Sequence, residues 1–249
     1  MNIIEITKLS HMFSNGTLAL DNIDFKAKRG EFIVIAGCNG SGKTTLLRHL
    51  NGLLFPTGGN VIVDGVNVSE DPVRARRIVG MVFQDSDTQI IGETVREDVA
   101  FGPENLALYR EEIEQRVDEA LRVTGLTCLA DARPHMLSGG EKRRLAIAGV
   151  LAMKPEILAF DEPFSNLDYP GTLQVLKQII GLHKMGRTII ITTHDLEKVI
   201  AHADRLIIMK SGRIAKEGSP ERILPDTEMF GIKEPCFSRM GLGMISWLN

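Results

Sequence analysis

The sequence lacks most features that would place it outside the cell, across a membrane or on nucleic acid. Its three cysteines, Cys38, Cys128 and Cys236, have no metal-binding spacing and no paired arrangement, which indicates a reduced, cytosolic compartment. No apolar run approaches the ~20 residues that a spanning helix needs, and Met1–Glu5 lacks the regions of a signal peptide. A formal net charge of -3 shows no basic excess, so nucleic acid is not an expected partner. Any membrane role would therefore depend on another chain.

A glycine-rich loop, Gly37-Cys38-Asn39-Gly40-Ser41-Gly42-Lys43-Thr44-Thr45, organises the rest of the chain. It follows a buried-strand pattern over 32–36 and precedes a helical pattern over 45–50, the context that the G-x-x-x-x-G-K-[ST] motif requires. Glycines let backbone N–H groups surround phosphate oxygens, and the helix start adds positive potential. Lys43 adds a point charge and Thr44 a hydroxyl for Mg²⁺. A plain glycine turn would need neither, so the loop predicts a phosphate site.

Short β-rich runs surround this loop. Runs over 3–8, 18–28 and 32–36, separated by turn signals, predict an antiparallel sheet that leads into the loop. Further strands are predicted over 60–63 and 79–83, and a hairpin over 205–217. Phe13 precedes the first turn and could stack on a base or belong to the core. Gln84 follows the strand over 79–83 and could bind a metal or be a solvated turn residue.

Between Asp85 and Leu151 the pattern becomes helical, which predicts an inserted lobe. An apolar face over 111–124 ends at Gly125, a helix stop signal. The next helix starts at Ser138, and Glu141 has the spacing of a capping box. Gly139 and Gly140 would leave bare backbone at a positive helix end, which predicts a second anion site.

Two further strands end in side chains suited to phosphate chemistry. The run over 157–160 ends in Asp161-Glu162-Pro163, and the run over 188–192 is followed by His194. Ligands of open α/β sheets gather at such carboxyl ends. Asp161 would hold Mg²⁺ directly or through water, and Glu162 would orient the attacking water as general base. His194 could donate a hydrogen bond to a γ-phosphate. The alternative for Asp161 and Glu162 is that acidic residues after strands are often turn formers.

The motifs occur along the chain in this order: the phosphate loop, Gln84, Leu137-Ser138-Gly139-Gly140-Glu141, Asp161-Glu162-Pro163, Ser165-Asn166-Leu167-Asp168 and His194. In this order they resemble the nucleotide-binding subunit of ATP-binding cassette transporters, over residues 1–222. Segments 82–90 and 98–106 look more narrowly like the ATPase of energy-coupling-factor importers of cobalt, nickel and vitamins. The resemblance implies an α/β fold: a P-loop NTPase core with a mixed sheet, an N-terminal antiparallel β-subdomain and an inserted α-helical subdomain over about 85–152. A C-terminal tail over 223–249 would follow.

The resemblance also implies a head-to-tail dimer, with itself or with a related ATPase subunit, that hydrolyses ATP with Mg²⁺. The phosphates would be held by Gly37, Asn39, Gly40, Ser41, Gly42, Lys43, Thr44 and Thr45. The metal would be held by Thr44, Gln84 and Asp161, and catalysis would use Glu162, His194 and Gln84. Phe13 would stack on adenine. Ser138, Gly139 and Gly140 would close over the ATP of the opposite subunit, with Asp168 at the seam.

Three residues depart from the family pattern. Glu141 stands where glutamine is commoner and could weaken hydrogen bonds at the dimer interface. Phe13 stands where tyrosine is commoner and loses only a hydroxyl. Cys38 is an unusual second residue of the loop and could make nucleotide binding thiol-sensitive.

The partners implied are an integral membrane coupling subunit, contacted by Gln84 and the segment 85–97, and a substrate-binding membrane subunit. The chain itself would be a peripheral protein at the cytoplasmic face of the membrane. The same resemblance leaves rivals in other classes. A DNA-maintenance ATPase should carry a long heptad insertion, and none is seen. A nucleotide kinase would lack the Ser-Gly-Gly helix, and translation-associated proteins typically hold two cassettes. In such importers a different membrane chain selects the solute. The apolar last residues, 241–249, are predicted to dock on the domain.

Overall fold

Two β-sheets organise the molecule, which a computed structural model describes over residues 1–248. The antiparallel sheet has the order β2-β1-β4-β5. Its strands are β1 (Asn2–Met12), β2 (Leu18–Lys28), β4 (Gly58–Val63) and β5 (Val66–Asn67). The mixed sheet has the order β10-β9-β3-β8-β7-β6 and is parallel except at β10. Its strands are β3 (Phe32–Ala36), β6 (Val79–Val82), β7 (Ile157–Asp161), β8 (Thr188–Thr193), β9 (Arg205–Lys210) and β10 (Arg213–Gly218).

The placement of β3 corrects one prediction. We expected this run to continue the antiparallel sheet of β1 and β2, but it pairs in parallel with β8 and β9 in the other sheet. All five residues of β3 are buried, and alternate side chains enter different cores: Phe32, Val34 and Ala36 on one face, Ile33 and Ile35 on the other. A strand buried on both faces has no polar alternation, so local pattern cannot identify its partners.

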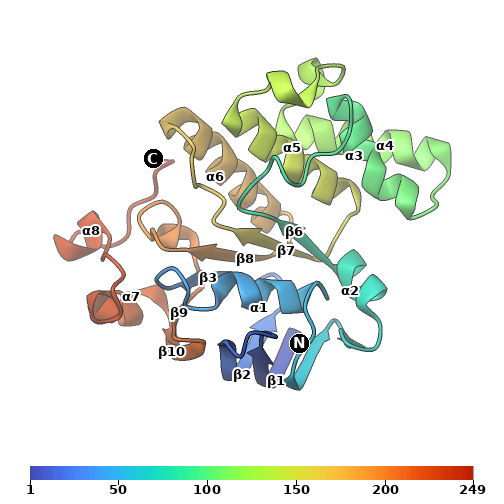
Figure 1. Cartoon of the computed structure of the whole chain (residues 1–249). Coiled ribbons are helices and arrows are strands. Elements are labelled where there is room, and N and C mark those ends of the chain that lie inside the picture. Colours follow the sequence, from blue (N-terminus) through green and yellow to red (C-terminus); the bar gives the residue numbers. More distant parts are fainter. Residues whose placement is uncertain (249) are drawn as a thin grey trace.

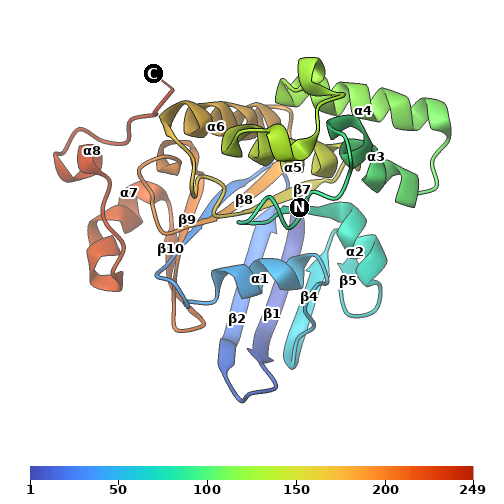
Figure 2. The ribbon, with the colours of Figure 1, turned by 45° about the horizontal axis from the view of Figure 1, so that its top comes forward.

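Helices cover both faces of the mixed sheet. On one face α1 (Lys43–Leu50) packs with both sheets in a shared core. On the other face lie α6 (Tyr169–Lys184) and part of α5 (Gly139–Ala152), as Figure 2 shows above the sheet. The ends of the parallel strands are thereby held between fixed layers, and the segments that leave those ends are positioned by the sheet.

A helical lobe stands at one end of this layered core (Figure 1). Helices α3 (Val95–Asn105), α4 (Arg110–Thr124) and α5 share a third apolar cluster, and α2 (Pro72–Ile78) connects β5 to β6. The stop at Gly125 is confirmed, since this residue ends α4 with a left-handed backbone. The first helix begins at Val95 rather than at Asp85. Asp98 accepts the N–H groups of Ile91 and Gly92, which holds the preceding segment outside the helix.

The C-terminal segment lies at the opposite end of the sheet from the lobe (Figure 1). It contains α7 (Pro220–Ile223), a 3₁₀ turn over Leu224–Phe230 and α8 (Cys236–Arg239). Ile232 is buried in the main core, and Met244 and Trp247 pack against that core. Of the last apolar residues, Met244 and Trp247 therefore dock on the domain as predicted, whereas Leu242 and Leu248 are exposed and Asn249 lies outside the described residues. Within residues 1–248, no helix combines the length and apolar character that a bilayer crossing requires.

Candidate functional site

The glycine-rich loop between β3 and α1 is tight at its ends and accessible in its middle. A Cβ on Gly37 would lie 2.4 Å from Ser41 Oγ and 2.5 Å from the Met209 carbonyl oxygen, so no side chain fits there. Gly42 caps α1 with a φ of 102°, a conformation that favours glycine. Cys38, Asn39 and Gly40 are exposed. An anion can therefore reach the loop and the start of α1.

Lys43 is held by the loop in which it lies. Its side chain is only 6% exposed. The Nζ atom donates to the carbonyl oxygens of Gly37, at 2.6 Å, and Cys38, at 3.2 Å. It also lies 3.8 Å from Oε1 of Glu162. The charge of Lys43 is therefore kept at the loop, close to a carboxylate from another strand.

The two carboxylates after β7 have different environments. Asp161 is buried and accepts a hydrogen bond from Thr192 Oγ1 at 2.6 Å. Glu162 follows with a φ of 47°, and its N–H donates to the Thr192 carbonyl oxygen at 3.0 Å. This left-handed backbone is unusual for a residue with a side chain. The bend lets two adjacent acids take separate positions beside β8.

His194 meets Glu162 at the same sheet edge. Its Nδ1 atom lies 3.0 Å from Glu162 Oε1, and its side chain is 58% exposed. Parallel strands β3, β8 and β7 are neighbours, so the loops that leave their carboxyl ends converge. The structure thus brings Lys43, Glu162 and His194 together from three distant parts of the chain.

The three residues expected to hold a metal line one cavity of about 490 Å³. Thr44 contributes a hydroxyl, Gln84 an amide and Asp161 a carboxylate, and Arg48 and Phe83 also line this cavity. Oxygen atoms of these types are the ligands that Mg²⁺ prefers. The residues that line the cavity therefore fit this ion.

Ser138, Gly139 and Gly140 lie apart from the phosphate loop. Ser138 caps α5: its hydroxyl and N–H both donate to Glu141 Oε2, at 2.7 and 2.8 Å. These bonds lower the pKa of the Glu141 carboxyl. Gly139 lines a second hollow of about 310 Å³ together with Gln84 and the segment 165–167, and no phosphate-loop residue borders it. Within one chain, the hollow beside the predicted second anion site and the phosphate loop share no lining residue.

Asp168 has a local structural role in this chain. It caps α6, because its Oδ1 atom accepts the N–H of Gly171 at 2.9 Å. The start of α6 approaches the start of α5 closely, since a Cβ on Gly140 would lie 3.3 Å from the Cα of Gly171. The segment that ends at Asp168 is therefore fixed beside Gly139 and Gly140.

Comparison with known families shows the family to which the chain belongs. Residues 20–165 match the ABC transporter family. The chain belongs to this family of ATP-binding cassettes. It is therefore an ATPase, as its resemblance implied, and the α/β fold that we expected is confirmed. The cassette is 46% identical to the energy-coupling factor transporter ATP-binding protein EcfA of Methanocaldococcus jannaschii, over 92% of this chain and 83% of the relative.

Solved structures agree with this assignment. CbiO1 from Clostridium perfringens, part of the ABC transporter complex CbiONQ, superposes with a TM-score of 0.83 and 38% identity, over 96% of the cassette and 97% of CbiO1. A dimeric ATP-binding cassette in a post-hydrolysis state, bound to ADP and phosphate, has a TM-score of 0.77 and 30% identity. That alignment covers 87% of the present cassette and 98% of the solved chain.

Phe13 is not a core residue of the cassette. The residue is 39% exposed, and its ring packs edge-on against the His11 ring, with the centroids 4.7 Å apart. His11 in turn contacts the buried His49 of α1, whose Nε2 lies 3.2 Å from His11 Nδ1. Burial lowers the pKa of His49. Phe13 thus has an exposed face on a fixed support, as an aromatic platform for a base requires.

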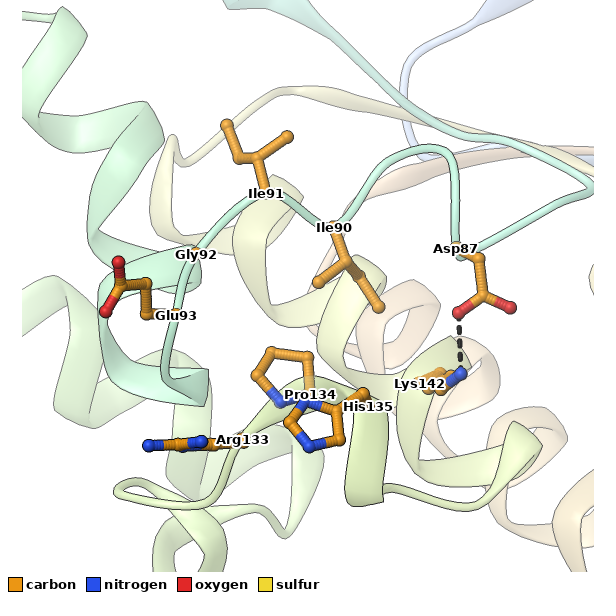
Figure 3. A pocket seen from close by; sticks show the side chains of 9 residues that line it. All are labelled: Asp87, Ile90, Ile91, Gly92, Glu93, Arg133, Pro134, His135 and Lys142. Carbon is orange, nitrogen blue, oxygen red and sulfur yellow. Dashed lines mark hydrogen bonds and ion pairs between the residues drawn. The ribbon is translucent and has the colours of Figure 1, made fainter.

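A groove on the helical lobe borders the segment that follows Gln84. It measures about 480 Å³ and is lined by Asp87, Ile90, Ile91, Gly92, Glu93, Arg133, Pro134, His135 and Lys142 (Figure 3). Lys142 Nζ lies 2.6 Å from Asp87 Oδ1, which ties this segment to α5. Ile91 projects from the segment and is 59% exposed.

Two residues of the site were not found from the sequence. Thr192 holds Asp161, but nothing local distinguishes it from the other residues of a buried β8. Arg143 is buried and contacts the backbone at Gln84, although it lies in a run of three basic residues that reads as a solvated surface. Both act through contacts between distant segments, which spacing along the chain does not reveal.

Proposed function

We propose that this ABC ATPase drives solute import as the ATP-hydrolysing subunit of an energy-coupling-factor transporter. The solute class would be cobalt or nickel ions, or a vitamin. The observation that carries the proposal is the 46% identity to EcfA across 92% of the chain. The likeness to CbiO1, part of the CbiONQ complex, supports a multisubunit assembly. The formal net charge of -3 gives no support to the alternative, an ATPase that acts on nucleic acid or the ribosome.

In this proposal the phosphate loop binds the triphosphate. Lys43 exchanges its bonds with the loop carbonyls for phosphate oxygens, while Gly37, Asn39, Gly40, Ser41, Gly42 and Thr45 complete the cradle. Adenine stacks on the exposed ring of Phe13. Thr44, Gln84 and Asp161 hold Mg²⁺ in their shared cavity. When bound, this ion neutralises negative charge on the phosphates.

Glu162 is the proposed general base. Its carboxylate is nearly buried and lies within reach of both His194 and Lys43, so it is oriented before substrate arrives. Glu162 accepts a proton from the attacking water and positions that water. His194 donates a hydrogen bond to the γ-phosphate through its exposed ring, and Gln84 is the third proposed catalytic residue. Thr192 donates a hydrogen bond to Asp161 and thereby orients its carboxylate.

The second anion site is proposed to complete the ATP site of an opposite subunit. Gly139 borders a hollow that no phosphate-loop residue lines, which supports a contact of Ser138, Gly139 and Gly140 with another chain. A head-to-tail dimer places them against the other loop, with Asp168 at the seam. ATP then attracts both subunits, and hydrolysis with phosphate release removes the attraction. The solved post-hydrolysis relative is itself dimeric. The second copy is either this chain or a related ATPase.

The groove of the helical lobe is the proposed contact with an integral membrane coupling subunit, which a substrate-binding membrane subunit would accompany. The groove begins at the segment after Gln84, so the segment over residues 85–97 would transmit closure of the ATP site. The cassette would sit at the cytoplasmic face of the membrane as a peripheral subunit.

Extraction of the tagged full chain from native membranes in mild detergent tests this proposal. We expect identified integral membrane chains to co-purify with the parent protein. Ile91→Asp should abolish this recovery, because it places a charge at the exposed edge of the groove. Val73→Asp, on the exposed face of α2, is the matched control and should retain it. Co-purification of nucleic acid without a membrane chain would contradict the transport proposal.

A further inference from the structure

Arg143 is a buried guanidinium to which the roles above assign no task. Only 3% of the residue is exposed, although it lies on α5 one turn after Gly139. Its Nη1 atom donates to the Phe83 carbonyl oxygen, and its Nη2 atom donates to the Gln84 carbonyl oxygen at 2.5 Å. These carbonyls belong to the two peptide groups that flank the Cα atom of Gln84. One side chain therefore holds the backbone on both sides of this glutamine.

The chemistry of this contact requires arginine. A planar guanidinium presents several N–H donors in a rigid fork, whereas a lysine ammonium is a single point on a flexible stem. Burial lowers the pKa of the Arg143 guanidinium, and the charges of Asp85 and Asp161 raise it. Because a buried charge is costly unless it is hydrogen-bonded, the two carbonyl dipoles and the nearby acids keep the group in place.

We propose that Arg143 is the positioning residue of Gln84 and ties it to the start of α5. The inference rests on the role proposed above for Gln84 in its own ATP site. Helix α5 begins with Gly139 and Gly140, which are proposed to contact ATP on the opposite subunit. Arg143 therefore connects a residue of one ATP site to the helix that completes the other, and a shift of α5 moves the backbone of Gln84.

Arg144 provides a matched control on the same helix. Its Nη1 atom donates to the carbonyl oxygens of Thr124 and Gly125, at 3.1 and 3.2 Å. The chemistry is the same, but both acceptors belong to the end of α4 within the helical lobe. Loss of Arg144 should loosen the lobe without releasing Gln84.

Hydrogen exchange of the nucleotide-free full chain tests the contact itself. We expect Arg143→Gln to accelerate amide exchange in peptides that cover 83–87 and to leave 121–126 protected. Arg144→Gln should give the reverse pattern. If peptides covering 83–87 exchange at the parent rate in Arg143→Gln, the inference is overturned. Should Arg143→Gln fail to fold, Arg143→Lys keeps the charge and the stem but not the fork, and the same comparison applies to it.

A double-mutant cycle tests whether Arg143 acts through Gln84. Arg143→Gln should lower kcat for ATP hydrolysis about 10- to 100-fold, as losses of supporting contacts at metal sites do, with KM for ATP little changed. In a Gln84→Ala background the same substitution should add no further loss, whereas the effect of Arg144→Gln should multiply with that of Gln84→Ala. Multiplying losses for Arg143→Gln would overturn the inference. Parent-like turnover of Gln84→Ala itself would instead reject the role of Gln84.

Discussion

The Oε1 atom of Glu162 lies 3.0 Å from Nδ1 of His194. The same oxygen is 3.8 Å from Nζ of Lys43. These side chains follow β7, β8 and β3, which are neighbours in the order β3-β8-β7 although far apart in sequence. A single carboxylate oxygen thus lies next to both Lys43 and His194. We infer that its position is set by the sheet before any nucleotide binds, so its loss should affect turnover more than binding.

Glu162→Gln tests this expectation. The amide keeps the size of the side chain but cannot accept a proton from water, so turnover should fall about 10²- to 10⁴-fold. ATP binding should be retained, because the phosphate loop is unchanged, and the closed dimer should accumulate. Phosphate release gives the turnover, and light scattering gives the dimer. Glu156→Gln, which changes an exposed carboxylate at the other end of β7, should behave like the parent. Phosphate release near the parent rate would reject Glu162 as the base.

Thr192→Val should weaken metal binding through Asp161. The substitution keeps the shape of the side chain but removes the donor that lies 2.6 Å from Asp161 Oδ1. We expect a cost of about 1–3 kcal/mol in the free energy of unfolding and a rise of about 10- to 100-fold in the Mg²⁺ concentration needed for hydrolysis. Chemical denaturation and Mg²⁺ titration measure the two effects.

Thr188→Val is the control for this experiment. Thr188 is also buried in β8, and its Oγ1 atom accepts the N–H of Gly30 at 2.9 Å, away from the site. It should destabilise the fold without changing the Mg²⁺ requirement. Equal Mg²⁺ curves for both variants would show that Thr192 does not support Asp161.

The capping box of α5 should make the stability of this helix start depend on pH. The Ser138 hydroxyl and N–H lower the pKa of the Glu141 carboxyl. A carboxyl whose pKa is lower in the folded state stabilises the fold above its unfolded pKa, and this stabilisation is lost as pH falls through the folded value. We expect Ser138→Ala to lower stability by about 1 kcal/mol at neutral pH and by less below about pH 4.

Thermal denaturation over this pH range measures the effect of Ser138→Ala. Asp71→Ala removes the cap of α2, in which Asp71 Oδ1 accepts the N–H of Arg74 at 3.0 Å, and Asp71 does not line the cavity of Thr44, Gln84 and Asp161. It should lower Tm without lowering turnover, whereas Ser138→Ala should lower both. A Ser138→Ala variant with full turnover would indicate a purely structural cap.

Much of the site could be predicted because its residues directly follow buried runs. Asp161 and Glu162 follow β7, His194 follows β8, and the loop to Lys43 follows β3. In each case a local apolar pattern marks the strand, and parallel strands bring their carboxyl ends to one edge. The capping box at Ser138 and the helix stop at Gly125 are likewise local signals, and both are present.

The features of the fold and site that the sequence did not predict depend on contacts between distant segments. The partners of β3 are β8 and β9, more than a hundred residues further along, and the buried run of β3 resembles any other buried strand. Arg143 has a charged side chain of the kind that is typical of a protein surface. It is buried only because β6 ends against α5. Such contacts are properties of the packed layers rather than of any short stretch.

Complementation between two inactive variants tests the head-to-tail dimer. Lys43→Ala removes the charge of the phosphate loop, and Gly139→Asp places a carboxylate where the opposite subunit's phosphates would lie. A Cβ on Gly139 meets nothing closer than 3.9 Å, so the second variant should fold.

Each variant alone should be inactive, because every site of its dimer contains a defect. In a mixed dimer one site combines the intact loop of the Gly139→Asp chain with the intact Ser138–Gly140 segment of the Lys43→Ala chain. Mixing should therefore restore ATP hydrolysis, and Gly139→Ala should remain active without mixing. A mixture as inactive as its components would mean that both groups act on the same ATP within one chain.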